Sequence, residues 1–538
     1  MFFMDFKTNK MIKKLCLTAL LALSAGGAWA QQVLDIPFRE GEYWWGGAVA
    51  QGSNMPYTRA MEAFDLERRV DNNLTAPLLV SSDGRYVWSE KPFAFSVSES
   101  GLRLQSRYDS LTVEQGGRTL REAFLAAGSR HFAPDGQIPP ELFFAKPQYN
   151  TWIELMYDQN QQDILAYARA ILANGLPAGI LMIDDNWQRR YGNFDFRTEA
   201  FPDARGMVDE LHRMGFRVMV WISPFVSPDS PEFRELREKG YLVEDKSGRP
   251  AIIRWWNGYS ASYDLTNPEA VAHLSARLKE MQRKYGVDGF KCDAGDPDFY
   301  RSDRQSYHDS AAVSTDHTQA WAEFALGFPF HEMRAGWKTG GHPVVQRLGD
   351  KNCSWRALQS LIPQMVATGL MGYPYACPDM IGGGQIESFR HADLSRIDQE
   401  LVVRSAQVHA LMPMMQFSVA PWRILSPDKL EMVKAAAALH QRFAPYILDC
   451  ARRASQTGDP IVRHMEYEFP HEGMAGCKDQ YMLGDKYLVA PMVTKGRSRT
   501  VKLPKGRWRD DTGKNWRGGR EVTIDVPLGR LPYFERLK

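Results

Sequence analysis

The sequence predicts an α/β protein, a (β/α)8 TIM barrel flanked by an N-terminal β-sandwich and a C-terminal β domain. The first observation is an alternation of buried strand-like runs with helix-period segments over residues 147–445. The second is that short alternating strands occupy the sequence on both sides. The third is length, because 538 residues exceed one hydrophobic core and fit a barrel of roughly 250 residues with smaller domains.

The outer regions consist of short strands separated by turn residues. Residues 31–146 contain strand-like runs at 77–80, 86–88 and 93–97, and this spacing is typical of a β-sandwich. Residues 446–538 return to the same pattern at 487–490, 500–503 and 521–524, which predicts a second, smaller β domain.

The central region, residues 147–445, alternates between two kinds of segment. It contains strand candidates at 151–155, 179–183, 217–222 and 287–291 and helix candidates at 161–174, 207–214 and 231–239. A doubly wound sheet is the alternative. It would require a G-x-G-x-x-G phosphate turn after an early strand, and the sequence has none. The alternation of strands and helices, without a phosphate turn, therefore favours the barrel.

The first thirty residues have the features of a secretory signal. Lysines at 7, 10, 13 and 14 precede an apolar run over 15–25, which is too short to span a bilayer. Ala28-Trp29-Ala30 then provides an A-x-A cleavage site, so we expect cleavage after Ala30. The mature chain is expected to be periplasmic or secreted, without stable membrane insertion.

The charge and the cysteines exclude several classes of partner. Basic and acidic side chains number 66 and 64, so the net charge of +2 does not indicate binding to nucleic acid. Five cysteines follow the signal at irregular spacing, and none forms a C-x-x-C pair. This pattern is neither a disulfide framework nor a zinc site, and we expect no metal or other cofactor. The sequence leaves the oligomeric state open.

Carboxylates follow several predicted barrel strands. They are Asp184, Asp185, Asp293, Asp350 and Asp379. A single aspartate after a strand is commonly a turn former or a helix cap, but chemistry in a barrel sits at these carboxyl ends. The set could instead hold Ca²⁺ or Mg²⁺. The cations Lys291, Arg334 and Arg347 disfavour a metal, since they repel it and donate well to sugar hydroxyls.

These segments carry a resemblance to glycoside hydrolase family 31. Residues 288–296 (DGFKCDAGD) resemble the segment of that family that contains its nucleophile. A second set of residues resembles the acid/base and substrate-loop signature of the same family. This set consists of Arg334, Gly349-Asp350, Trp355, 369–374 (GLMGYP) and 379–383 (DMIGG). Within the family, residues 254–257 (RWWN), 265–268 (LTNP), 416–418 (QFS) and 421–422 (PW) most resemble the branch of the myogenesis-regulating glycosidase and similar bacterial α-galactosidases.

The resemblance implies roles for individual residues. Asp293 matches the nucleophile and Asp350 the general acid/base of a retaining, exo-acting α-glycosidase. The residues that match substrate-binding positions, or that stand beside them, are Asp184, Asp185, Trp221, Trp256, Lys291, Arg334 and Asp379. The substrate would be an oligosaccharide or another glycoside.

The chemistry of retention explains why these residue types are needed. One carboxylate must attack C1 as an anion, and a carboxylic acid must protonate the leaving oxygen. Lys291 lies two residues before Asp293 on the same strand face, where we expect it to lower the pKa of Asp293. Asp350 must hold a proton near neutral pH, which requires burial or a neighbouring carboxylate.

The sugar specificity rests on departures from the family pattern. Relatives that act on glucose often have a tryptophan at the position of Lys291 and another near Arg347. The lysine and arginine favour an α-galactosidase. The alternatives are an α-glucosidase or an enzyme for α-xylosides, α-N-acetylgalactosaminides or sulfoquinovosides. From a different class, a non-catalytic glycan-binding protein on the same scaffold also stays open.

Overall fold

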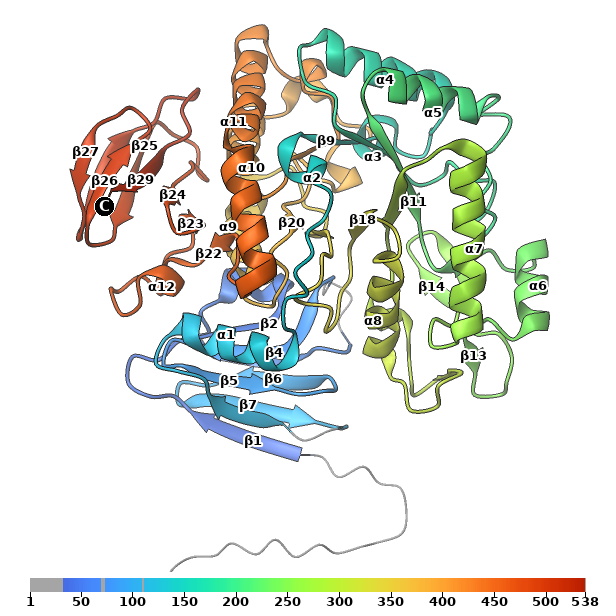
Figure 1. Cartoon of the computed structure of the whole chain (residues 1–538), viewed down its shortest axis with the longest axis horizontal. Helices are drawn as coiled ribbons and strands as arrows, with labels where there is room; N and C mark the ends of the chain where they lie inside the picture. Colours follow the sequence, from blue (N-terminus) through green and yellow to red (C-terminus); the bar gives the residue numbers. More distant parts are fainter. Residues whose placement is uncertain (1–31, 69–72, 109–110, 538) are drawn as a thin grey trace, which may run out of the picture.

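The computed structural model describes residues 32–68, 73–108 and 111–537 and shows three regions around one barrel (Figure 1). The N-terminal strands, in blue, pack at one end of the barrel, and the C-terminal strands, in red, lie beside the long helix α11 (Pro427–Thr457). This arrangement confirms the predicted fold class. The predicted signal at residues 1–30 lies outside the described residues.

The N-terminal region consists of two antiparallel sheets, ordered β1-β7-β6-β3 and β2-β4-β5-β8. The strands are β1 (Gln32–Pro37), β2 (Trp44–Ala48), β3 (Met61–Asp65), β4 (Thr75–Ser81), β5 (Arg85–Trp88), β6 (Phe93–Val97), β7 (Gly101–Ser106) and β8 (Thr112–Gln115). Every residue of β4 is buried. The region also contains the 3-10 helix η1 (Val49–Asn54) and ends in helix α1 (Leu120–His131) and the short α2 (Leu142–Ala145).

The barrel is a sheet of eight parallel strands in the order β20-β19-β18-β16-β11-β10-β9-β21. The strands are β9 (Gln148–Asn150), β10 (Ile180–Ile183), β11 (Arg217–Ile222), β16 (Gly289–Cys292), β18 (Phe330–Met333), β19 (Gln346–Arg347), β20 (Ala376–Cys377) and β21 (Gln416–Phe417). A backbone hydrogen bond of 2.9 Å from the N–H of Ile381 to the carbonyl of Gln416 links the two edges of the sheet.

Helices surround the barrel strands (Figure 1). They are α4 (Gln161–Ala173), α5 (Ala204–Arg213), α6 (Pro231–Lys239), α7 (Pro268–Tyr285), α8 (Ser314–Ala325), α9 (Trp355–Gly369) and α10 (Gln399–Ala410), followed by α11. Local signals set the ends of α6, whose predicted bounds are confirmed. Ser230 caps its first turn, Pro231 opens it, and Gly240 ends it in the left-handed conformation at φ 70°.

The predicted strand at 151–155 is wrong. The strand there is β9, which ends at Asn150, and residues Trp152–Leu155 form the short helix α3. The side-chain oxygen of Asn150 accepts the N–H of Trp152 at 2.8 Å, so the chain turns at Thr151 instead of extending. The predicted strand at 287–291 is displaced by one to two residues, since β16 comprises Gly289–Cys292.

Smaller elements complete the barrel region. They are β12 (Phe225–Val226), β13 (Glu244–Asp245), β14 (Ile253–Trp255), β15 (Gly258–Ser262), β17 (Gln305–Ser306) and the 3-10 helices η2 (Pro297–Phe299), η3 (Ile386–Ser388), η4 (Leu394–Arg396) and η5 (Pro421–Arg423). Strands β14 and β15 form an antiparallel hairpin that carries the predicted site residue Trp256 between them.

The C-terminal region has a separate small core. One sheet has the order β22-β23-β24-β29-β26-β27, and β25 pairs with β28. The elements are β22 (Val462–Arg463), α12 (Met465–Glu468), β23 (Tyr481–Leu483), β24 (Tyr487–Val489), β25 (Ser498–Leu503), β26 (Arg507–Asp510), β27 (Asn515–Arg517), β28 (Arg520–Asp525) and β29 (Tyr533–Leu537). Trp508 and Phe534 are fully buried in this core. Helix α11 precedes it and runs across the predicted boundary at 445. None of the described helices is long and apolar enough to cross a membrane.

Strand β16 depends on a glycine at its first position. A Cβ atom on Gly289 would lie 1.8 Å from the carbonyl oxygen of Phe330 on the adjacent strand β18. We expect Gly289→Ala to lower the free energy of unfolding by about 1–3 kcal/mol, because the backbone must shift. Thermal unfolding followed by circular dichroism measures the change. Gly476→Ala is the control, since a Cβ there has no neighbour within 4 Å. Equal melting temperatures for the two variants would contradict the close approach.

Candidate active site

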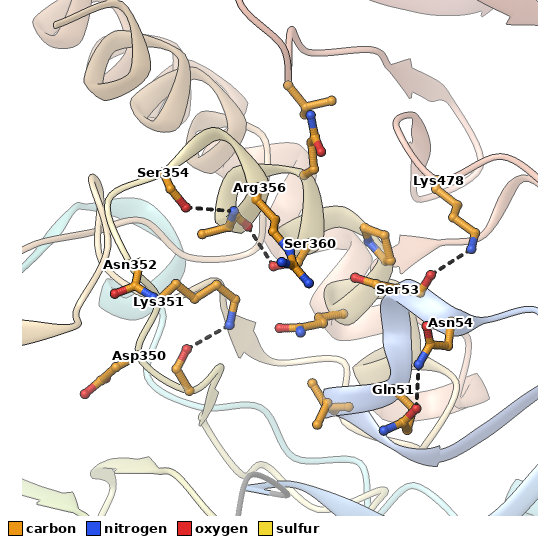
Figure 2. Close-up of a pocket in the computed structure, with 18 of the residues that line it drawn as sticks. Gln51, Ser53, Asn54, Asp350, Lys351, Asn352, Ser354, Arg356, Ser360 and Lys478 are labelled. Carbon is orange, nitrogen blue, oxygen red and sulfur yellow. Dashed lines mark hydrogen bonds between the residues drawn. The ribbon is translucent and has the colours of Figure 1, made fainter. Parts of the chain in front are cut away.

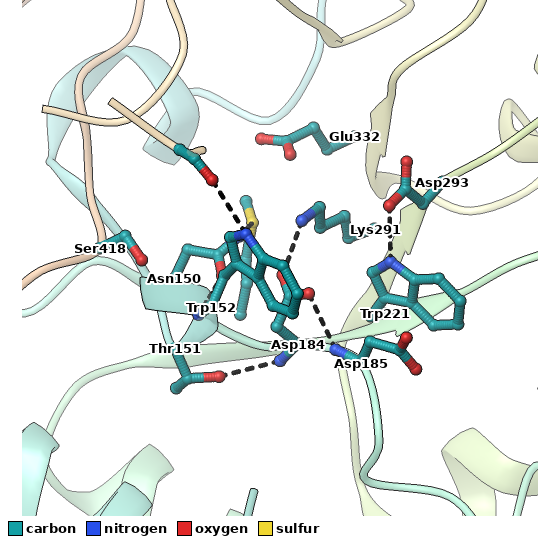
Figure 3. Close-up of polar contacts among 12 residues, drawn as sticks. Asn150, Thr151, Trp152, Asp184, Asp185, Trp221, Lys291, Asp293, Glu332 and Ser418 are labelled. Carbon is teal, nitrogen blue, oxygen red and sulfur yellow. Dashed lines mark hydrogen bonds and ion pairs between the residues drawn. The ribbon is translucent and has the colours of Figure 1, made fainter. Parts of the chain in front are cut away.

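Asp293 follows β16 directly and lies in a mostly buried position, with 8% of its surface exposed. The indole N–H of Trp221 donates to its Oδ2 at 2.8 Å, as Figure 3 shows. The backbone N–H of Ala294 donates to Oδ1 at 3.0 Å. Ala294 adopts φ 58°, so the chain turns sharply after the strand and leaves the carboxylate at its end.

Cations and a hydrogen bond keep Asp293 ionised. Burial raises the pKa of this carboxyl, but Arg334, Lys291 and Arg347 and the hydrogen bond from Trp221 outweigh burial and hold the pKa below its usual value. Arg334 contributes most among the cations, with Nη1 3.6 Å from Oδ1. The predicted effect of Lys291 is present, but it is secondary to that of Arg334.

Lys291 forms its short contact with Asp184 instead. The ammonium lies 2.6 Å from Asp184 Oδ2, and both side chains are at least 94% buried (Figure 3). Asp184 follows β10 and Lys291 lies on β16, so strand β11 separates their strands in the sheet. The pair therefore joins side chains across the mouth of the barrel.

Asp185 is held by two residues to which the sequence assigned no role. The amide of Asn257 donates to its Oδ2 at 2.5 Å, and the hydroxyl of Tyr191 donates to the same oxygen at 3.1 Å. Burial and the adjacent Asp184 raise the pKa of Asp185 to about 7. Asn257 stands in the 254–257 segment, which gave a signal for it, whereas no motif pointed to Tyr191.

Arg334 links the buried carboxylates to the exposed rim. Its Nε lies 3.2 Å from Asp296 Oδ2, and Asp296 is 1% exposed. Its guanidinium carbon lies 4.8 Å from the ring centre of Trp256, which is 44% exposed. Of the two predicted aromatic positions, Trp256 therefore lies at the surface, and Trp221 is buried beneath Asp293.

Arg347 on β19 bridges three carboxylates. The distances are 2.7 Å to Asp350 Oδ1, 3.2 Å to Glu332 Oε1 and 3.4 Å to Asp379 Oδ1. The sequence missed Glu332, a buried residue on β18 that also accepts a hydrogen bond of 2.7 Å from Gln416 Nε2. Burial raises the pKa of Glu332, and the cations Arg347 and Lys291 oppose that effect.

Asp350 and Asp379 differ in access. The Asp350 side chain is 27% exposed, whereas that of Asp379 is 1% exposed. Asp379 Oδ2 accepts backbone N–H groups from Lys351 at 2.8 Å and Gly384 at 3.1 Å. Burial and the neighbouring Asp350 raise the pKa of Asp379 to about 6. Asp379 thus orders the loops next to Asp350, and Asp350 is the carboxylate that an incoming group can reach.

The structure brings the predicted site residues into one charged cluster at the carboxyl ends of the barrel strands. Cations hold Asp184, Asp293, Asp350 and Asp379 in ion pairs of 2.6–3.6 Å. Within the described part of the chain, no group of three or more His, Cys, Asp or Glu residues is placed to hold a metal ion. The arrangement can offer one buried anion and one accessible carboxyl to a bound substrate.

Comparisons with known proteins identify the family. Residues 137–450 match the TIM-barrel domain of glycosyl hydrolases family 31, and residues 458–537 match the C-terminal domain of that family. The chain belongs to glycosyl hydrolase family 31. The resemblance in the sequence is thereby confirmed, and the chain is a member of a family of glycosidases.

Named relatives within family 31 differ in how much of their length the chain spans. The myogenesis-regulating glycosidase of Mus musculus is 31% identical over 91% of this chain and 74% of its own length. The sulfoquinovosidase of Escherichia coli is 27% identical over 64% of this chain and 53% of its own. A family 31 dextranase of Flavobacterium johnsoniae, solved with glucose, superposes with a TM-score of 0.82 at 20% identity, over 95% of this chain and 67% of that one.

The buried pair of Lys291 and Asp184 gives a prediction for stability. We expect Lys291→Met to lower the free energy of unfolding by about 3–5 kcal/mol, because Asp184 would stay buried without its cation. Urea denaturation measures the change. Lys239→Met is a matched control, since Lys239 also lies 2.6 Å from its partner Glu235 but is 42% exposed, and exposed pairs contribute about 0–1 kcal/mol. A loss as small as that of the control would contradict the role of the pair.

Proposed function

We propose that this family 31 protein is a retaining, exo-acting α-galactosidase with Asp293 as nucleophile and Asp350 as general acid/base. The observation that carries the proposal is the contrast between these two carboxyls. Asp293 is held as a buried anion by Arg334 and Trp221. Asp350 stands at the end of the next-but-one strand with its side chain open to solvent.

In the first step, Asp293 Oδ attacks C1 of the sugar as the bond from C1 to the leaving oxygen breaks. Asp350 gives its proton to that oxygen, so the alcohol departs neutral and a glycosyl ester of Asp293 forms. Arg334, 3.6 Å from Asp293, keeps the carboxylate ionised until it reacts. Trp221 fixes its orientation through the hydrogen bond to Oδ2.

In the second step, water attacks C1 and transfers a proton to the Asp350 carboxylate, and the bond from C1 to Asp293 breaks. Asp293 regains its negative charge, and the product keeps the α configuration after two inversions. Arg347, 2.7 Å from Asp350, holds this carboxyl group in position for its action as base in this step. Both aspartates thus return to their starting protonation states.

The preference for α-galactose rests on the side chains that face the sugar. Lys291 is fixed by Asp184 at 2.6 Å, and Arg347 is fixed among carboxylates. The site around Asp293 therefore presents hydrogen-bond donors and acceptors at positions where the tryptophans of glucose-active relatives would give a flat apolar wall. A charged, directional set of this kind suits an axial hydroxyl, which projects from the face of the ring, better than an apolar wall does.

A panel of aryl α-glycosides with one leaving group tests the proposal. We expect the highest kcat/KM on the α-galactoside. Because all the substrates share one leaving group, differences in kcat/KM report how the enzyme contacts the sugar. The comparison substrates are the α-glucoside, α-xyloside, α-N-acetylgalactosaminide and α-sulfoquinovoside. Faster turnover of any of these substrates would contradict the preference for galactose and would assign the specificity to that sugar instead. Measurable binding without hydrolysis of any substrate would favour a glycan-binding protein.

Two variants separate the roles of the aspartates. We expect Asp293→Asn to abolish turnover of every substrate, because no nucleophile remains. Asp350→Asn should lower kcat/KM on a galactosyl disaccharide by about 10²–10⁴-fold and much less on an aryl galactoside whose leaving group needs no proton. Asp393→Asn is the control, because Asp393 is an exposed residue that precedes η4 as its N-cap, a position that asparagine also suits. Full activity of Asp350→Asn on the disaccharide would refute its assignment as acid/base.

A further inference from the structure

A large cavity opens beside Asp350, where the three regions of the chain meet. Its volume is about 1140 Å³. Its lining comes from the N-terminal η1, from the barrel helix α9 and from the C-terminal region at Lys478. In Figure 2, Asp350 and Lys478 lie toward opposite sides of the view.

The lining places the cavity on the leaving-group side of the site. Asp350 and Arg334 border it, but the lining contains neither Asp293 nor the buried pair Asp184 and Lys291. A general acid donates its proton to the leaving oxygen, so the space next to the acid and away from the nucleophile receives the aglycone. Typical small-molecule pockets have volumes of about 300–1,000 Å³, so this cavity has room for more than one sugar ring.

The walls of the cavity are set by contacts between the regions. Helix η1 packs on α9 at Gly52, where a Cβ atom would lie 2.8 Å from Cα of Gln364. Next to this contact, the ammonium of Lys478 donates to the carbonyl oxygen of Ser53, also in η1, at 2.7 Å and joins the C-terminal region to the N-terminal one. The hollow is therefore part of the fold, because η1 contacts both the barrel helix α9 and the C-terminal region.

The cavity carries cations that lack a carboxylate partner. In the part of the chain that the structure describes, no hydrogen bond or ion pair engages the guanidinium of Arg356, and the ammonium of Lys478 contacts only a carbonyl. The lining carboxylates are already paired, Asp479 with Arg499 at 3.0 Å and Asp350 with Arg347. The first turn of α9, which includes Arg356, also opens on the cavity with its N-terminal, positive end.

We propose that the cavity binds an extended saccharide aglycone that carries an acidic group, and that Arg356 and Lys478 recognise its negative charge. The inference rests on the proposed function, because it takes Asp350 as the acid that faces the leaving group. It assigns the natural substrate to a class, an α-galactosyl oligosaccharide with a uronic acid or sulfate on the side of the leaving group. The protein then binds the sugar that is cleaved at the barrel and recognises the negative charge of the leaving group in the cavity between the regions.

A set of three substrates tests the inference. They are an aryl α-galactoside, a neutral α-galactosyl trisaccharide, and the same trisaccharide with a uronic acid as its terminal unit on the leaving side. We expect kcat/KM to be about tenfold or more higher for the acidic than for the neutral trisaccharide, because charge-assisted hydrogen bonds form. The acidic-to-neutral ratio should fall toward one in about 1 M NaCl, where the screening length is about 3 Å.

Variants connect the ratio to the two cations. We expect Arg356→Gln with Lys478→Gln to reduce the acidic-to-neutral ratio to near one. Arg237→Gln on α6, an exposed arginine outside the cavity, should leave the ratio unchanged. Because Lys478 also joins two regions, the single variant Arg356→Gln, which removes no hydrogen bond or ion pair among the described residues, provides the test if the double variant fails to fold. This variant should lower the ratio by about threefold, as expected for the loss of one exposed ion pair.

The outcomes distinguish this inference from the proposed function. No preference for the acidic trisaccharide in the unmodified enzyme, or an unchanged ratio in Arg356→Gln, would overturn the inference while hydrolysis of the aryl galactoside still supports the function. Failure to cleave the aryl galactoside would instead overturn the proposed function.

Discussion

The site depends on the neutralisation of buried negative charge by two cations, Lys291 and Arg347. An unpaired buried carboxylate costs several kcal/mol, and here several carboxylates converge at one end of the barrel. Lys291 balances Asp184, while Arg347 contacts Glu332, Asp350 and Asp379. These two ion-pair groups allow the barrel to present acidic groups in a largely buried setting.

The parallel barrel supplies the geometry for this balance. Adjacent strands in register place Lys291 on β16 beside Glu332 on β18, and Arg347 on β19 follows at the next strand. On these three neighbouring strands, positive and negative side chains therefore alternate. Asp293, at the end of β16, has cations near it from its own strand, from the segment that follows β18 and from β19. Its low pKa follows from this placement.

The regions around the barrel line a cavity beside Asp350. The barrel provides the groups near Asp293, whereas the junction of η1, α9 and the C-terminal region forms the cavity beyond Asp350. In the function and the inference proposed above, recognition of the sugar that is cleaved is separate from recognition of the group that leaves. With this division, substitutions can alter the surface where the regions meet without disturbing the buried ion pairs, whose disruption would be strongly destabilising.

The sequence by itself determined the features that local chemistry controls. The cap, proline and glycine of α6 fixed its bounds, and the family segment around Asp293 identified that residue, which follows a buried strand. The strand predicted at residues 151–155 is wrong, because a hydrogen bond from the backbone N–H of Trp152 to the side-chain oxygen of Asn150 outweighs their strand-like composition. Only the tertiary structure decided the partners of Lys291, the roles of Tyr191 and Glu332, and the cavity between domains. Those depend on contacts between residues far apart in the chain, which no local pattern encodes.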